Sequence, residues 1–147
     1  MTADRHDPLS AKRFVLVVEP DVLVRVVVAE YLREAGLMVV EAIDAVEALA
    51  VHRSDFAIDV TLVNVAGIGD TPSFELAHRI RAETPRAHVL LVSTVESLAR
   101  EVQHLCSSAR AGSASSPVSS SHVSSSHIRS SHGAALLEQR LRRLLKR

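Results

Sequence analysis

Short, continuous apolar runs alternate with amphipathic stretches along the first 106 residues of this 147-residue chain. Each run is rich in Val and Leu, as are the strands of a parallel sheet that is covered on both faces. The four runs are FVLVV (14–18), LMVVEA (37–42), DVTLVNV (59–65) and HVLLVST (88–94). Strands and helices that alternate at this spacing predict an α/β domain with a parallel sheet and helices on both faces.

The stretches between and after these runs have the apolar periodicity of helices packed on a sheet. We expect helices over residues 22–35, 45–53, 72–82, 97–106 and 134–147. Gly36 is expected to end the first helix, and the carboxylate of Asp44 to cap the start of the second. In the third helix, the predicted buried stripe consists of Phe74, Ala77 and Ile80.

A serine-rich segment interrupts the pattern after residue 106. Residues 107–132 read SSARAGSASSPVSSSHVSSSHIRSSH, which has too little apolar surface to offset the entropy lost on ordering. We therefore expect a flexible loop over 107–127 and a flexible tail over 1–12, within a single domain that spans 13–147. The final helix is expected to bury Leu137, Leu141, Leu144 and Leu145.

Histidines recur in the serine-rich segment, at His122, His127 and His132. Imidazole is a common metal ligand. However, a spacing of five does not place these side chains on one helical face, and low-complexity His/Ser tracts of this kind have no preformed site. We predict no metal site there.

Composition excludes several classes of protein. Lys plus Arg and Asp plus Glu number 17 each, so the chain lacks the excess positive charge typical of nucleic-acid binders and polybasic membrane binders. The lone Cys106 cannot form an internal disulfide, no apolar run is long enough to span a membrane, and the polar N-terminus does not resemble a secretory signal. We expect a cytoplasmic protein with neither a membrane nor a nucleic-acid partner.

Several stretches, in this order, resemble the receiver domain of bacterial response regulators, the CheY-like family. They are VLVVEPDVLVR (15–25), VNVAGIGDTPSFELAHRIR (63–81), LLVST (90–94) and IRSSHGAALLEQRLRRLL (128–145). The resemblance implies a doubly wound, five-stranded parallel sheet of flavodoxin-like (βα)5 topology, with the serine-rich irregular segment before the last strand and helix. It also implies a site at which an Asp that ends the third strand is phosphorylated with the help of Mg²⁺.

The residues that match this phosphorylation site depart from the family pattern. Asn64 stands at the phosphoacceptor position, where a neutral amide cannot form a stable acyl phosphate. The family's pair of metal-binding acids falls on Glu19 and Pro20, so one of two carboxylates is missing. Ser93 retains the hydroxyl expected after the fourth strand, and the family's Lys position falls near Arg129. We therefore expect the Mg²⁺ site to be lost, with no catalytic residue.

These losses predict a degenerate, stand-alone receiver domain that is not an enzyme and acts as a phosphorylation-independent interaction module in signalling. We expect no output domain after the last helix, so function is expected to reside in a surface. The resemblance implies the face formed by the fourth helix, fifth strand and fifth helix. The expected partners are proteins of a signalling pathway, either a histidine kinase or another regulator, with a homodimer as an alternative.

The same residues also allow other interpretations. A phosphorylatable single-domain regulator would use a substitute acid, such as Asp21 or Asp70, and a small-molecule binder could share the flavodoxin-like scaffold, since fold alone does not fix function. Glu19 is either a weak cation ligand or a solvated carboxylate at a loop mouth. The hydroxyl of Ser93 is either part of a site or bonded to nearby backbone. Arg129 either pairs with Glu19 or lies exposed on a loop.

Overall fold

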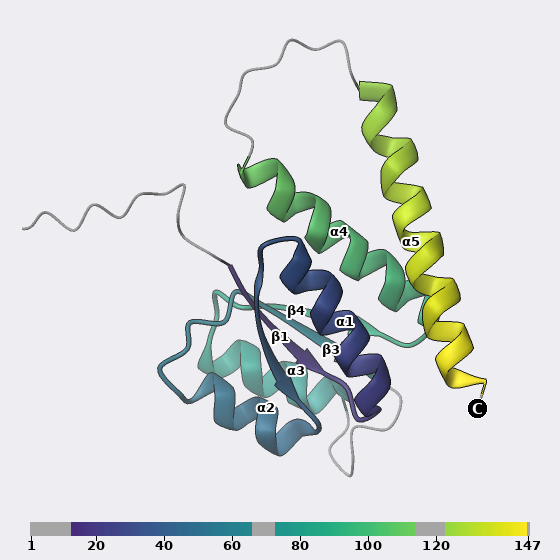
Figure 1. The fold of residues 1–147 in the computed structure, drawn as a ribbon. Helices are drawn as coiled ribbons and strands as arrows, with labels where there is room; N and C mark the ends of the chain where they lie inside the picture. The colour runs from purple at the N-terminus through teal and green to yellow at the C-terminus, as the bar shows by residue number, and fades with distance from the viewer. Residues whose placement is uncertain (1–12, 66–72, 114–122, 147) are drawn as a thin grey trace, which may run out of the picture.

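The computed structural model describes residues 13–65, 73–113 and 123–146, which form a parallel sheet covered by helices (Figure 1). The strands are β1 (Phe14–Val18), β2 (Met38–Ala42), β3 (Val60–Asn64) and β4 (His88–Val92). The helices are α1 (Val22–Glu34), α2 (Ala45–His52), α3 (Ser73–Glu83), α4 (Val95–Ser113) and α5 (Val123–Leu145). Within the described residues the strand order is β2-β1-β3-β4, and every pair is parallel. The predicted doubly wound α/β fold is confirmed.

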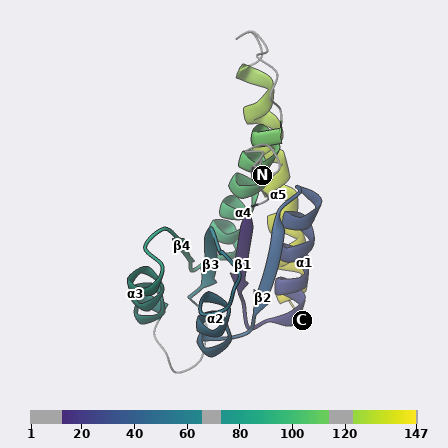
Figure 2. The same cartoon turned by 90° about the vertical axis from the view of Figure 1, so that its left-hand side faces the viewer.

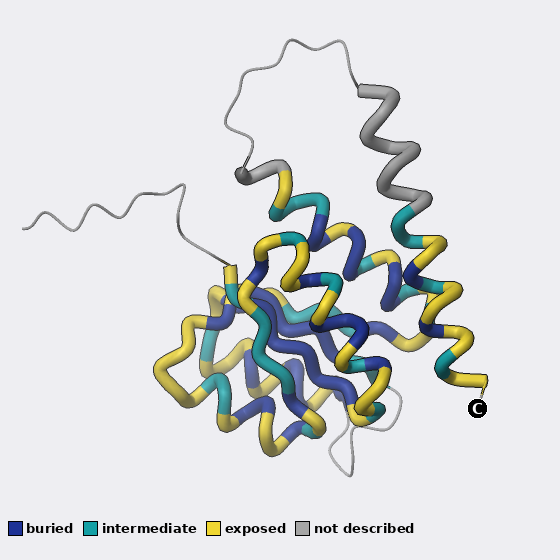
Figure 3. The backbone as a smooth tube through the Cα atoms, viewed as in Figure 1, coloured by how far each residue is buried: buried dark blue, intermediate teal, exposed yellow. Residues whose placement is uncertain are grey.

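Two layers of helices enclose the sheet. Helices α2 and α3 cover one face, and α1, α4 and α5 cover the other (Figures 1 and 2). Side chains alternate along the central strand β1, so that Val15 and Val17 pack with α1, α4 and α5, whereas Leu16 and Val18 pack with α2 and α3. All four are buried, and Figure 3 shows the buried strands at the centre of the molecule. Burial on both faces explains why the runs lack polar alternation.

The predicted helix ends are confirmed at two positions. Helix α1 ends just before Gly36, which has a φ of +93°, and the carboxylate of Asp44 accepts a hydrogen bond of 2.9 Å from a backbone N–H in the first turn of α2. The predicted stripe of α3 is wrong in one member. Ala77 and Ile80 are buried, but Phe74 is 78% exposed, because it lies on the opposite side of the helix from the sheet.

The C-terminal third differs from the expectation. Residues 107–113 belong to α4 and residues 123–127 to α5, so the predicted loop over 107–127 is wrong for both parts, while 114–122 lie outside the described residues. The fifth strand expected near Arg129 is also wrong, because that residue lies in α5 and the described sheet has four strands. Helices α4 and α5 contact each other side by side (Figure 1), and a helix anchored by packing propagates into weaker sequence, since each added residue closes one backbone hydrogen bond.

Substitution of Gly36 by alanine is expected to destabilise the protein by about 1–2 kcal/mol, because a residue with a β-carbon is strained in the left-handed region. No atom lies within 4 Å of the position that a β-carbon would occupy, so the cost is one of backbone conformation alone. Urea denaturation measures it. Gly36→Asn is the matched control, since Asn tolerates this region better and should cost less. Equal stability of wild type and Gly36→Ala would contradict the assignment.

Candidate functional site

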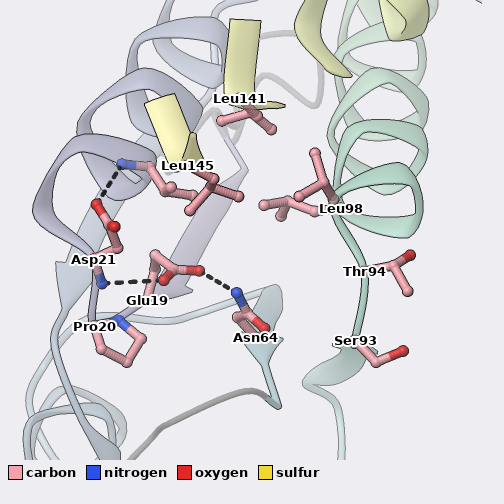
Figure 4. Close-up of a pocket in the computed structure, with 11 residues that line it drawn as sticks. Glu19, Pro20, Asp21, Asn64, Ser93, Thr94, Leu98, Leu141 and Leu145 are labelled. Atoms are coloured by element: carbon pink, nitrogen blue, oxygen red, sulfur yellow. Dashed lines mark hydrogen bonds between the residues drawn. The ribbon is translucent and has the colours of Figure 1, made fainter. Parts of the chain in front are cut away.

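The candidate site lies where the carboxyl ends of three neighbouring strands meet. Glu19 directly follows β1, Asn64 ends β3 and Ser93 directly follows β4. Such strand ends share one edge of a parallel sheet, which is where ligands bind in open α/β folds. A cavity of about 370 Å³ opens at this edge (Figure 4). Its lining residues are Glu19, Pro20, Asp21, Val24, Asn64, Ser93, Thr94, Val95, Leu98, Leu141 and Leu145.

Glu19 and Asn64 are joined by a short hydrogen bond at the base of this cavity. The amide Nδ2 of Asn64 donates to Oε2 of Glu19 at 2.6 Å, and the backbone N–H of Asp21 donates to Oε1 at 3.1 Å (Figure 4). Glu19 is only 5% exposed, so the expectation of a solvated carboxylate is wrong. Burial raises the pKa of Glu19, and the hydrogen bond from Asn64 opposes that rise in part.

Asp21 caps helix α1. Its Oδ1 accepts hydrogen bonds from the backbone N–H groups of Leu23, at 2.9 Å, and Val24, at 3.2 Å. This is the ordinary role of an Asp at an N-cap, where the side chain satisfies amides that have no partner within the helix. Pro20, which separates Asp21 from Glu19, is exposed and has no ligand atom in its side chain.

Ser93 lies at the rim of the cavity, exposed to solvent, and its side chain points away from Asn64 in Figure 4. The backbone N–H of Ser93 donates to Oγ of Ser97 at 3.3 Å. The hydroxyl of Thr94 and that of Ser97 meet at 3.0 Å, and the backbone N–H of Ser97 donates to Oγ1 of Thr94 at 3.0 Å. The hydroxyls of Thr94 and Ser97 therefore organise the start of α4.

The structure does not place Arg129 at the end of a strand. Its backbone lies in α5, in the part of that helix whose side chains are outside the description, so its pairing with Glu19 stays a prediction. A different guanidinium lies near the site. Nη1 of Arg25 donates to the backbone carbonyl of Glu19 at 2.8 Å, and Nε lies 3.3 Å from the carboxylate of Glu41. The sequence analysis did not single out Arg25 as a site residue.

Helix α5 also contributes residues that sequence reasoning had assigned to the core alone. Leu141 is buried and Leu145 is 48% exposed, and both line the cavity from the side opposite Glu19 (Figure 4). The leucine spacing indicated an apolar stripe, but the spacing does not show which part of the sheet the end of that stripe covers. The predicted buried stripe is therefore wrong for Leu145, whereas Leu137 and Leu141 are buried in the core and Leu141 also lines the cavity.

Metal-ligating groups do not gather elsewhere in the described ranges. Among the residues whose side chains the structure describes, 13–65, 73–110 and 133–146, no three side chains of His, Cys, Asp or Glu lie close enough together to hold an ion. His122 and Asp70 lie outside the described residues, and His127 and His132 lie in the part of α5 without described side chains. Of the helices that the structure describes, none combines the length and apolar character needed to cross a membrane.

Comparison with known proteins gives structural relatives only. No protein-family model and no curated protein sequence matches the chain. Among solved structures, a response regulator receiver protein from Pseudomonas putida is 28% identical, with a TM-score of 0.53 over 65% of this chain and 81% of that one. The MaeR response regulator, bound to beryllium trifluoride, is 18% identical, with a TM-score of 0.50 over 56% of this chain and 67% of that one. The chain therefore has the fold of response-regulator receiver domains of the CheY-like type.

Proposed function

We propose that this protein is a degenerate receiver domain that acts in the cytoplasm as a phosphorylation-independent protein-interaction module in signalling. The observation that carries the proposal is the hydrogen bond between Asn64 and Glu19, at the end of β3. A carboxylate at this position could attack a phosphoryl group, but a neutral amide is a poor nucleophile and instead acts as a donor to Glu19. At the position of a reactive acid, the chain therefore has an amide that is hydrogen-bonded to the carboxylate of Glu19.

The donor set does not fit Mg²⁺. This ion prefers near-octahedral oxygen ligands at about 2.0–2.1 Å and keeps several waters. Pro20 offers no side-chain ligand, the carboxylate of Asp21 caps α1, and the carboxylate of Glu19 is buried and faces an amide N–H group. We infer that the domain needs neither the ion nor any catalytic residue for its function.

The engagement of Asp21 also argues against its use as a substitute phosphoacceptor. Its Oδ1 accepts hydrogen bonds from two backbone N–H groups of α1, and phosphorylation there would remove the cap, which is worth about 0.5–2 kcal/mol.

Without phosphorylation, the function of the domain would depend on an interaction surface, and we propose the exposed side of α4 and α5. Leu136 on α5 is 58% exposed, which suits an apolar contact with a histidine kinase, another regulator or a second copy of the chain.

Intact-mass measurement after incubation with acetyl phosphate and Mg²⁺ tests the loss of phosphorylation. We expect no gain of mass for the wild type, because no acceptor carboxylate lies at the end of β3. The double change Pro20→Asp, Asn64→Asp is the matched control, and it should take up more phosphoryl group than either single change, since the two positions act together. An acid-labile mass gain of one phosphoryl group on the wild type would contradict the proposal.

The interaction part of the proposal has its own test. The immobilised domain should retain a candidate histidine kinase or regulator equally with and without acetyl phosphate. Leu136→Asp should weaken that retention, whereas Val46→Asp, at a 75% exposed position on α2, should leave it unchanged. Retention that requires the phosphodonor would contradict phosphorylation independence, and equal weakening by both substitutions would contradict the choice of surface.

A further inference from the structure

The cavity at the strand ends has mostly apolar walls. Val24 lines it from α1, Val95 and Leu98 from α4, and Leu141 and Leu145 from α5. Its volume of about 370 Å³ falls in the range of small-molecule sites, roughly 300–1,000 Å³, which combine apolar walls with a few fixed polar groups. A cavity walled in this way suits an organic molecule better than a hydrated ion, because aliphatic side chains cannot replace the ion's water ligands.

The two carboxylates of the cavity, those of Glu19 and Asp21, lie on the same side of it, across from Ser93 and Thr94 (Figure 4). Oε2 of Glu19 accepts a hydrogen bond from the amide of Asn64, and Oε1 accepts one from the backbone N–H of Asp21, whereas a carboxylate has room for about four. The nearby Arg25 directs its guanidinium to the backbone carbonyl of Glu19 and to the carboxylate of Glu41. The side chain of Glu19 therefore retains acceptor capacity at the end of an apolar chamber, and a bound cation would favour its ionised form.

We propose that this cavity binds a small molecule with a compact apolar body and a primary ammonium group, the ammonium at the Glu19 end and the body between Leu98, Leu141 and Leu145. An ammonium supplies donors and the opposite charge, which a buried carboxylate requires. A carboxylate or phosphate ligand would face two like charges, and a neutral alcohol would leave the charge without a counter-ion. The site is independent of phosphorylation and goes beyond the proposed function.

Methyl NMR of the full-length, isotopically labelled chain tests this with three probes of nearly equal shape: 2-phenylethylamine, 2-phenylethanol and 3-phenylpropanoate. We expect the amine to shift the methyl signals of Val95, Leu98 and Leu141 in a saturable way. The alcohol should bind at least about tenfold more weakly, as expected for loss of one charge-assisted hydrogen bond, and the carboxylate should cause no saturable shift.

Variants show whether the cavity and its charge are responsible. Val95→Phe should fill the cavity and abolish the amine shifts, while the same change at Val46, which is 75% exposed on α2, should leave them intact. Leu145→Phe, at a half-exposed cavity position, provides a second filling variant if Val95→Phe does not fold. Glu19→Gln should bring the affinity of the amine to within about threefold of that of the alcohol.

The proposal is overturned by any of three results. The first is equal binding of the amine and the alcohol to the wild type. The second is an amine-induced shift of methyl groups that lie outside the cavity, such as those of the exposed Val22 and Val26 on α1. The third is the absence of any shift of the cavity methyl signals with millimolar concentrations of each probe. Unchanged binding of the amine to both Val95→Phe and Leu145→Phe would also overturn the proposal, because the ligand would then bind outside the cavity.

Discussion

Leu137→Ala is expected to destabilise the protein by about 2–5 kcal/mol, the usual cost of removing a fully buried leucine side chain. Leu137 is 0% exposed and belongs to the apolar cluster that α1, α4 and α5 form on one face of the sheet. The truncation leaves a void among side chains that are held by both the sheet and two other helices. A loss of this size is a large fraction of the stability of a small domain.

The neighbouring Leu136 provides the matched control. It lies on the same helix and is 58% exposed, so Leu136→Ala should change the free energy of unfolding by no more than about 0.5 kcal/mol. Urea denaturation of both variants gives the difference. Truncation after Gly133 removes the whole packed half of α5 and should cause unfolding or aggregation. If Leu137→Ala and Leu136→Ala unfold alike, α5 does not pack on the sheet as described.

The four strands could be predicted from sequence because helices cover both faces of the sheet, and β1 and β3 are buried along nearly their whole length. Only such strands combine continuous apolar runs with a length of about five residues, as in Val60–Asn64. The C-terminal third could not be predicted in the same way. Serine and histidine tracts carry no apolar period, so whether they form loop or helix depends on the packing of α4 against α5, which is a tertiary contact. The prediction that Phe74 is buried was wrong for a related reason, because periodicity does not show which side of α3 meets the sheet.

The residues of the site were found in part. Glu19 and Asn64 could be placed together because the resemblance to receiver domains aligns both with that family's site, and the structure puts both at the carboxyl ends of parallel strands. The hydrogen bond between them, the capping role of Asp21 and the cavity wall from Leu141 could not be found, since each depends on side-chain geometry between distant segments. The position of Arg129 was wrong because the match relied on a fifth strand where the chain is helical.

Asn64→Asp is expected to lower the free energy of unfolding at neutral pH by about 1–3 kcal/mol, the cost of leaving a buried polar group without its partner. In the wild type the amide of Asn64 donates to Glu19 at 2.6 Å. The substitution removes that donor and brings a second carboxylate against a buried one, so one of the two must be protonated or both must separate. Thermal and urea denaturation at pH 7 measure the loss.

The pH dependence of that loss identifies its cause. Burial already raises the pKa of Glu19 in the folded wild type above its ordinary value of 4.5, so its contribution to stability is present below that value and is lost as pH rises through the folded pKa. In Asn64→Asp the paired carboxyls share a proton at low pH and repel when both are ionised. The difference in the free energy of unfolding between Asn64→Asp and wild type should therefore shrink as pH falls toward 4.5 and grow toward neutrality.

The exchange Glu19→Gln, Asn64→Asp restores one amide and one carboxylate with reversed polarity, and it should recover most of the lost stability and remove this pH dependence. An Asn64→Asp protein as stable as wild type at pH 7, or an exchanged pair no more stable than Asn64→Asp alone, would show that the amide–carboxylate bond does not hold the site together.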